Sequence, residues 1–273
     1  MNDLRGKTIF ITGSSRGIGR EIALRCALEG ANLVITGKTS DPHPKLPGTI
    51  HTVAAEVLQA GGKALAIQLD VRDETAIKAA VEQTVQYFGG IDVLVNNASA
   101  INLTRTLDTP ARRLDLMWGV NMRATFLASQ ACIPHLKKSA NPHILTLSPP
   151  LNMDAKWFAP HVAYTMSKYG MSLCTLGMAR EFAADGIAIN CLWPRTTIAT
   201  AAIEFNFPEA VLRASRKPAI MADAAHAILT RNSRSCTGNF FVDEDVLRET
   251  GVEDFAPYAV SPGTPLFTDL FLD

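Results

Sequence analysis

The fold is decided near the start of the chain, by the stretch Thr8-Ile9-Phe10-Ile11-Thr12-Gly13-Ser14-Ser15-Arg16-Gly17-Ile18-Gly19. Its apolar first residues predict a buried strand, and the glycines that follow predict a tight turn into a helix. Gly13 can supply the turn, Gly17 lets backbone approach a pyrophosphate, and Gly19 lets helix and strand pack closely. The helix N-terminus then offers unpaired N–H groups to phosphates. The stretch favours nucleotide binding, although its spacing differs from Gly-x-Gly-x-x-Gly.

Outward from this stretch, strand-like and helix-like segments alternate along the chain. The further strand candidates are apolar almost throughout, as expected in a parallel sheet covered on both faces. They are Asn32–Thr36, Ala64–Leu69, Val93–Asn96, His143–Leu147, Ile187–Leu192 and Asn239–Val242. The main helical patterns are Glu21–Leu28, Ala76–Phe88, Thr125–Lys137 and Ala163–Phe182. This order predicts an α/β fold, a doubly wound parallel sheet of about seven strands, with ligands at the carboxyl ends of the strands.

Length and composition exclude several classes of protein. The chain has 273 residues, which suits one domain over residues 1–273, and no linker divides it. Lys plus Arg equals Asp plus Glu at 26 each, so no global field attracts nucleic acid or an anionic membrane. The five cysteines lack zinc-site spacing, so we expect buried thiols and no metal. With no long apolar run and no room for a secretory signal, we expect a cytoplasmic protein without a membrane span.

The second strand candidate indicates which dinucleotide is preferred. Sites for NAD place an Asp or Glu at the end of this strand, to bond the ribose hydroxyls. Here the strand ends Ile35-Thr36-Gly37-Lys38, without an acid. Arg16 and Lys38 are both placed where a 2′-phosphate would lie, which favours NADP over NAD, with NAD still possible. The alternative is that Lys38 is only a solvated loop charge.

A second group of residues carries the chemistry. Ser148 ends the fifth strand, and Tyr164 and Lys168, four apart on a helix, share one face. A phenol has an ordinary pKa of about 10, and a nearby ammonium together with an oxidised nicotinamide favours its phenolate. Ser148 can hydrogen-bond the substrate oxygen, and Asn121 can hold a water that feeds protons to Lys168. The set predicts hydride transfer between a nicotinamide cofactor and a carbonyl or alcohol.

Together, the glycine loop, Asn96-Asn97-Ala98, Ser148 and Tyr164-x-x-x-Lys168 resemble the short-chain dehydrogenase/reductase family, from about Lys7 to Val242. The resemblance implies a Rossmann-type fold, with Asn121, Ser148, Tyr164 and Lys168 as the catalytic tetrad. It also implies a homodimer or homotetramer formed through the helices that carry Asn121 and Tyr164. The cofactor-binding residues expected on this basis are Gly13, Ser15, Arg16, Gly17, Ile18, Gly19, Lys38, Asp70, Val71, Asn97, Ala98, Tyr164, Lys168, Pro194 and Thr197.

A narrower resemblance, to the hydroxysteroid-dehydrogenase-like group of that family, is carried by Lys38–Leu46, Leu147–Asn152, Trp193-Pro194 and Phe271–Asp273. Eukaryotic members carry a sterol-carrier domain after this point, so we expect a stand-alone, bacterial-type relative.

The chain departs from the family pattern in several places. Pro194-Arg195 stands where Pro-Gly is usual, and Arg195 either adds a phosphate contact or points outward. Val242–Asp245 replaces the usual Val-Asp-Gly-Gly, which should change the packing of the C-terminal tail, 243–273. The insertion Thr39–Thr49 is interpreted as structural or as an oligomer contact. His161 is interpreted as structural, at the start of a helix.

Two segments are expected to face the substrate. The loop after Ser148 carries apolar residues that either pack locally or wall a pocket: Leu151, Met153, Trp157 and Phe158. The stretch Thr196–Lys217 should be a mobile lid, and its apolar residues suggest a greasy ligand: Ile198, Ala202, Ile203, Phe205 and Phe207.

Three hypotheses follow for function. The leading one is an NADP(H)-dependent oxidoreductase for an apolar small molecule of fatty-acyl, terpenoid or steroid-like kind. An enoyl reductase is a weaker rival. The rival from another class is a catalytically silent nucleotide-binding scaffold or regulator.

Overall fold

The computed structural model describes residues 3–42 and 46–273, and its centre is a seven-stranded sheet with the order β3-β2-β1-β4-β5-β6-β7. Every neighbouring pair of strands is parallel. The strands are β1 (Thr8–Ile11), β2 (Asn32–Gly37), β3 (Lys63–Gln68), β4 (Val93–Asn96), β5 (His143–Thr146), β6 (Ala188–Trp193) and β7 (Phe240–Val242). The expected α/β fold with a doubly wound parallel sheet is therefore confirmed.

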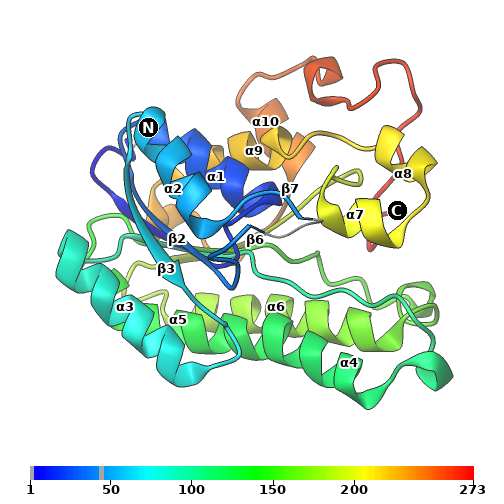
Figure 1. The fold of residues 1–273 in the computed structure, drawn as a ribbon, viewed down its shortest axis with the longest axis horizontal. Helices are drawn as coiled ribbons and strands as arrows, with labels where there is room; N and C mark the ends of the chain where they lie inside the picture. Colours follow the sequence, from blue (N-terminus) through cyan, green and yellow to red (C-terminus); the bar gives the residue numbers. More distant parts are fainter. Residues whose placement is uncertain (1–2, 43–45) are drawn as a thin grey trace.

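The helices form a layer on each face of the sheet (Figure 1). One layer holds α1 (Gly17–Ala27), α2 (Ile50–Gln59), α9 (Ala219–Leu229) and α10 (Asp243–Glu249). The other holds α3 (Glu74–Phe88), α4 (Ala111–Met117), α5 (Ala124–Leu136) and α6 (Val162–Glu181). A hydrophobic core fills the space between each layer and the sheet. This double cover explains why β1, β2, β4, β5 and β6 are buried along their whole length.

The direction of winding reverses at β1. This strand pairs with β2 on one side and with β4 on the other, so successive crossovers leave it in opposite directions. The helices that follow β1 and β4 therefore lie on opposite faces of the sheet (Figure 1), which opens a crevice at its carboxyl edge. The glycine loop follows β1 into this crevice.

Two segments cover the carboxyl ends of the strands. The first contains α7 (Ala201–Asn206) and α8 (Glu209–Arg213), and the end of the chain lies close to α8 in Figure 1. Backbone hydrogen bonds join the two segments, from Thr197 N–H to Phe267 C=O at 3.0 Å and from Phe267 N–H to Ala214 C=O at 2.9 Å. The lid is thus tied at its base to the C-terminal segment, while its mobility stays a prediction.

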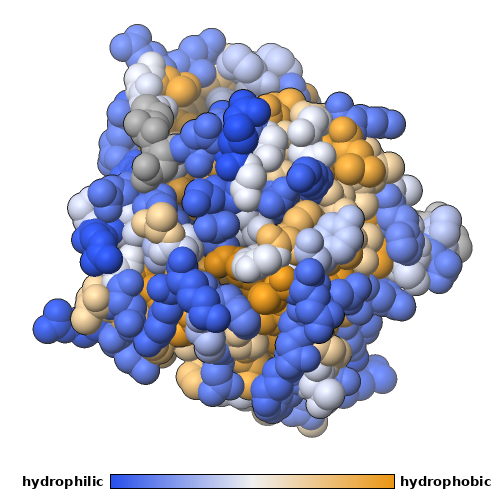
Figure 2. Space-filling model, turned by 90° about the vertical axis from the view of Figure 1, so that its left-hand side faces the viewer, coloured by the Kyte–Doolittle hydropathy of each residue, from blue (hydrophilic) through white to orange (hydrophobic). Residues whose placement is uncertain are grey.

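The side of the molecule away from α7 and α8 shows mostly hydrophilic residues, with hydrophobic ones visible between them (Figure 2). Among the described residues, no helix has the length and apolar character needed to cross a bilayer.

Candidate active site

The glycine loop is clamped onto the end of β4. Thr12 Oγ1 accepts hydrogen bonds from the N–H groups of Asn97 and Ala98, at 3.0 and 3.1 Å. Gly13 has φ +68°, and a Cβ placed there would lie 2.9 Å from Ala98 Cα. A Cβ on Gly19 would lie 2.5 Å from Asn97 Nδ2. Glycine is therefore required at both positions, for backbone conformation at the first and for close packing at both.

A groove of about 520 Å³ runs from this clamp toward the ends of β2 and β3. Its lining includes most of the expected cofactor residues, namely Gly13, Ser15, Arg16, Gly17, Ile18, Lys38, Asp70, Val71, Asn97 and Ala98. Gly19 lies beneath it, against Asn97. The residue before α1, Arg16, makes no side-chain cap, so the first N–H groups of the helix are left for a ligand. The groove fits a dinucleotide with its phosphates at the start of α1.

Cations border the groove on the adenosine side. The Arg16 guanidinium donates to Pro47 C=O, Gly48 C=O and Thr39 Oγ1, all of them uncharged acceptors. Among the residues that the structure describes, no carboxylate lies within ion-pair distance of Arg16. Lys38 instead lies 3.5 Å from a carboxylate oxygen of Asp70, which also pairs with Arg72. These cations hold the pKa of Asp70 well below its usual range.

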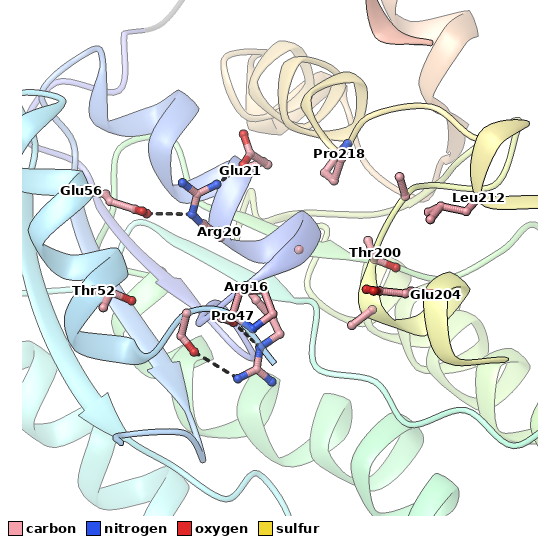
Figure 3. A pocket seen from close by; sticks show the side chains of 14 residues that line it. Arg16, Arg20, Glu21, Pro47, Thr52, Glu56, Thr200, Glu204, Leu212 and Pro218 are labelled. Carbon is pink, nitrogen blue, oxygen red and sulfur yellow. Dashed lines mark hydrogen bonds and ion pairs between the residues drawn. The ribbon is translucent and has the colours of Figure 1, made fainter. Parts of the chain in front are cut away.

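Arg16 also borders a neighbouring hollow of about 510 Å³ between α1, α2 and the lid (Figure 3). In this hollow Arg20 is neutralised by Glu56, at 2.7 Å. The described end of the 39–49 insertion holds Arg16 through Pro47 and Gly48, which supports the structural interpretation. Residues 43–45 of that insertion, His43-Pro44-Lys45, lie outside the described residues.

The expected catalytic pair lies on α6, in a cavity that adjoins the groove. Tyr164 and Lys168 are buried and line one cavity of about 150 Å³, together with Pro194. The Lys168 ammonium donates to Leu147 C=O at 2.6 Å and lies 5.0 Å from the centre of the Trp193 ring. Burial raises the pKa of the Tyr164 phenol above its ordinary value and lowers the pKa of Lys168 to about 7. The phenol is therefore protonated at neutral pH.

Ser148 lies apart from this pair in the structure, and a contact of its hydroxyl with the substrate oxygen stays a prediction. The residue is fully buried, and its Oγ donates to Cys191 Sγ at 3.1 Å. It is absent from the lining of the cavity, whereas its neighbour Leu147 is present. Beyond the end of β5, Ser148 N–H bonds back to Thr146 C=O, and this turn directs the side chain between β5 and β6.

Asn121 lies in a π-helical turn, Trp118–Arg123, between α4 and α5. Its side-chain amide accepts from Ala100 N–H at 2.7 Å and donates to Ala100 C=O and Ser167 Oγ, both at 2.9 Å. Both its oxygen and its nitrogen bond to protein, and the water expected to feed protons to Lys168 stays a prediction. Asn121 instead fixes the loop after β4 to α6, one residue from Lys168.

Residues after β6 divide between the cavity and the protein interior. Thr197 is buried with its Oγ1 on Ser215 Oγ at 2.7 Å and lines neither the groove nor the cavity, so its contact with the cofactor stays a prediction. The Arg195 guanidinium pairs with Asp245 at 2.6 Å, so it makes a surface ion pair. His161 precedes α6 and bonds to Thr165 Oγ1 at 3.0 Å, as its structural interpretation predicts.

The apolar loop after Ser148 packs around a residue from the far end of the chain. Phe271 is fully buried and packs with Leu151, Trp157 and Phe158 of this loop. Its ring also stacks on Tyr164, with centroids 6.2 Å apart. None of the loop residues lines the 150 Å³ cavity, and Met153 is exposed. Of the two interpretations of this loop, local packing and a pocket wall, the structure therefore favours local packing.

The cavity wall is completed by the lid and by residues that sequence reasoning missed. Four of the five apolar lid residues line it, while Phe205 is exposed. Asp269 and Leu270 line it as well, and the groove gains Thr39, Arg72, Ser99 and Thr200. No local pattern singled out Leu270 and Phe271, because other apolar residues such as Leu266 and Phe267 stand near them in the tail.

A doubly wound sheet with a glycine loop at its switch point and a Tyr/Lys pair across the groove defines a class of oxidoreductases. The chain belongs to the short-chain dehydrogenase/reductase family, since the family model for short chain dehydrogenase matches residues 7–208. Membership implies a nicotinamide cofactor, NAD or NADP.

Within the family, the chain is 61% identical over 270 residues to hydroxysteroid dehydrogenase-like protein 2 of Danio rerio. This match covers 99% of the chain but 65% of the relative, which is thus considerably longer. A crystal structure of a putative dehydrogenase from Xanthomonas campestris superposes with a TM-score of 0.97 at 55% identity, covering 99% of both chains. The crystal structure of a short chain dehydrogenase from Mycobacterium thermoresistibile superposes with a TM-score of 0.94 at 53% identity. The match covers 99% of this chain and 96% of the other. The narrower resemblance is confirmed.

Proposed function

We propose that the protein interconverts a carbonyl and an alcohol on an apolar small molecule, with NADP(H) as cofactor and Tyr164 as general acid and base. The observation that carries this is that Tyr164 and Lys168, one helical turn apart on α6, line a single cavity that adjoins the groove. The two spaces share lining residues, among them Ile18, Asn97 and Thr200. When bound, the cofactor supplies or accepts the hydride.

Tyr164 and Lys168 divide the work of moving the proton. In reduction, the phenol donates its proton to the carbonyl oxygen as negative charge develops there. The Lys168 ammonium, one helical turn away, stabilises the phenolate that remains. Asn121 keeps α6 and the Ala100 loop in place, and the lid excludes water from the apolar wall. In oxidation the same groups act in reverse.

The preference for NADP rests on Arg16 and Lys38 at the end of the groove. The Arg16 guanidinium bonds only uncharged acceptors among the described residues, so a 2′-phosphate would meet an uncompensated cation. At the end of β2, where an acid would bond ribose hydroxyls, the chain has Lys38. Apolar walls favour an apolar substrate, and the small cavity favours one whose reacting end is narrow.

Replacing Tyr164 by Phe tests the proposal. We expect kcat for NADPH-dependent reduction, across a panel of aldehydes and ketones, to fall by about 10³-fold, because the proton donor is lost while the ring stays in place. NADPH binding, measured by calorimetric titration, should persist. A wild-type protein that binds NADPH but turns over nothing would favour the scaffold hypothesis, which the turned-away Ser148 also supports.

We also propose a homo-oligomer formed through the outer face of the helices that carry Asn121 and Tyr164. Large apolar side chains are exposed there, including Trp118, Phe126 and Leu173. They border a shallow hollow of about 420 Å³ between α5 and α6. Such a patch on a soluble protein indicates an interface. Sedimentation equilibrium should give a dimer or tetramer, and a monomer would contradict the assignment.

A further inference from the structure

The cavity beside Tyr164 has one acidic lining residue among those that the structure describes, Asp269. It comes from the C-terminal segment and not from a strand end. The residue as a whole keeps some exposure but its carboxyl group is buried, and its Oδ1 accepts from Leu270 N–H at 2.7 Å. An acid at this place is unexpected, because the rest of the wall is largely apolar.

The backbone around Asp269 is held in place on both sides. Its N–H donates to Arg195 C=O at 3.1 Å, directly after the Pro194 that lines the cavity. The next carbonyl, of Leu270, accepts from Trp193 Nε1 at 2.8 Å. Phe271 then anchors the segment within the aromatic cluster around Tyr164. The carboxyl group is therefore part of a constructed wall.

The charged groups around Asp269 come from three elements. Lys168 and Tyr164 of α6 line the same cavity as Asp269, and Asp243, at the start of α10, interacts with it electrostatically. Asp243 is linked to it through one residue, because Arg195 N–H donates to Asp243 Oδ1 while Arg195 C=O accepts from Asp269. The guanidinium of Arg195 is paired with Asp245 instead. Cys191 lies near Lys168 on β6 and is held as a thiol, because burial raises its pKa to about 11.

Lys168 therefore has few sources of compensation for its charge. The ammonium contacts the neutral carbonyl of Leu147 and the face of the Trp193 ring. A buried ammonium without a counter-charge loses its proton readily. Burial raises the pKa of Asp269 to about 7, and that of Asp243 to about 6, so the carboxyl and the ammonium titrate in the same range.

We propose that Asp269 is a positioning residue of the active site, whose carboxylate stabilises the ammonium form of Lys168 and thereby sets the pH range in which Tyr164 exchanges its proton. The electrostatic half depends on this chain alone, and the catalytic half rests on the proposed function. Among the described residues no ion pair joins Asp269 and Lys168. The carboxylate therefore acts on the ammonium across a distance, and it affects the reaction only through Lys168. Through Asp269, the C-terminal segment thus influences proton exchange at Tyr164 in addition to covering the cavity.

The direct test follows Lys168 itself, in the full chain labelled with ¹³C at the lysine Cε and assigned with Lys168→Arg. Removing the carboxylate removes attraction for the ammonium, so the Lys168 midpoint should move to lower pH in Asp269→Asn, by about half a unit or more. Asp269→Glu should keep most of the wild-type midpoint. Asp245→Asn is the matched control, because it deletes an equal charge next to Arg195 on the surface. Equal midpoints in Asp269→Asn and Asp245→Asn would overturn the proposal.

Turnover gives the second readout. In Asp269→Asn the pH limb of kcat governed by Lys168 should move in the same direction, with kcat near neutral pH lower by about twofold or more and KM for NADPH little changed. A lower kcat with an unmoved limb would indicate a structural role and overturn the catalytic half. If the wild type reduces nothing, the proposed function fails, yet a shifted Lys168 midpoint would still support the electrostatic half.

Discussion

The cofactor side and the substrate side of this molecule are built by different means. Around the groove, backbone conformation decides the geometry: Gly13 and Gly19 admit no Cβ, and Thr12 bonds to the main chain of β4. Around Tyr164, side-chain packing decides it, and Phe271 touches groups from several distant segments. The first kind of construction leaves a local sequence pattern, and the second leaves almost none.

The largest effect should follow from Phe271→Ala, which attacks the packed side. Deleting a fully buried aromatic ring costs about 3–5 kcal/mol of unfolding free energy, measured by urea denaturation. Phe267→Ala, at a half-exposed position of the same segment, should cost about 1 kcal/mol or less. NADPH affinity should hardly change, because the groove does not depend on this ring. An equal loss of NADPH affinity would show that the two sides are not separate.

Gly13→Ala should act on the other side, with a smaller loss of stability. The new Cβ would sit at positive φ and 2.9 Å from Ala98 Cα, so about 2–3 kcal/mol is expected, with NADPH affinity reduced more than tenfold. Gly89→Ala is the control, since Gly89 has φ +89° but no atom within 4 Å of a Cβ. It should cost only about 1 kcal/mol and leave NADPH binding unchanged. Similar results for both variants would mean that the close approach to Ala98 is unimportant.

Lys38→Gln should have the smallest effect and sharpen the account of the groove. Losing a cation near the 2′-phosphate should raise the NADPH dissociation constant about tenfold, or about 1.4 kcal/mol, while NADH binding is unchanged. Lys78→Gln, on the exposed face of α3, controls for charge alone. An equal loss of affinity for NADPH and NADH would indicate that Lys38 stabilises the groove through its ion pair with Asp70 and does not bind the 2′-phosphate.

The order and type of the strands could be predicted because each strand is an apolar run covered on both faces. The glycine loop could also be predicted, because positive φ angles and close backbone packing select glycine over other residue types. The direction of the Thr197 and Ser148 side chains could not be predicted, because beyond a strand end it depends on the turn that follows. The helical patterns in the sequence do not include α2, α4, α9 or α10, and they place the starts of α1 and α6 differently from the observed Gly17 and Val162.

The contribution of Asp269 and Phe271 could not be predicted for another reason. They reach Tyr164 across more than a hundred residues of chain, and no periodic pattern records such a contact. The lid gave a partial signal through its apolar residues, but Phe205 and the cavity-lining Phe207 look alike in sequence and differ only in where the short helix α7 places them.

The π-helical turn at Trp118–Arg123 also limits how the chain can vary in length. Such a turn holds one residue more than the neighbouring α-helical turns, and one residue corresponds to a rotation of about 100°. A single deletion here would rotate α5 relative to α4, withdraw Asn121 from Ala100 and turn Met122 away from Gly170, where the two helices meet closely. The number of residues in this helical turn is therefore constrained as well as their identity. Substitutions would not reveal this constraint, because they leave the length of the turn unchanged.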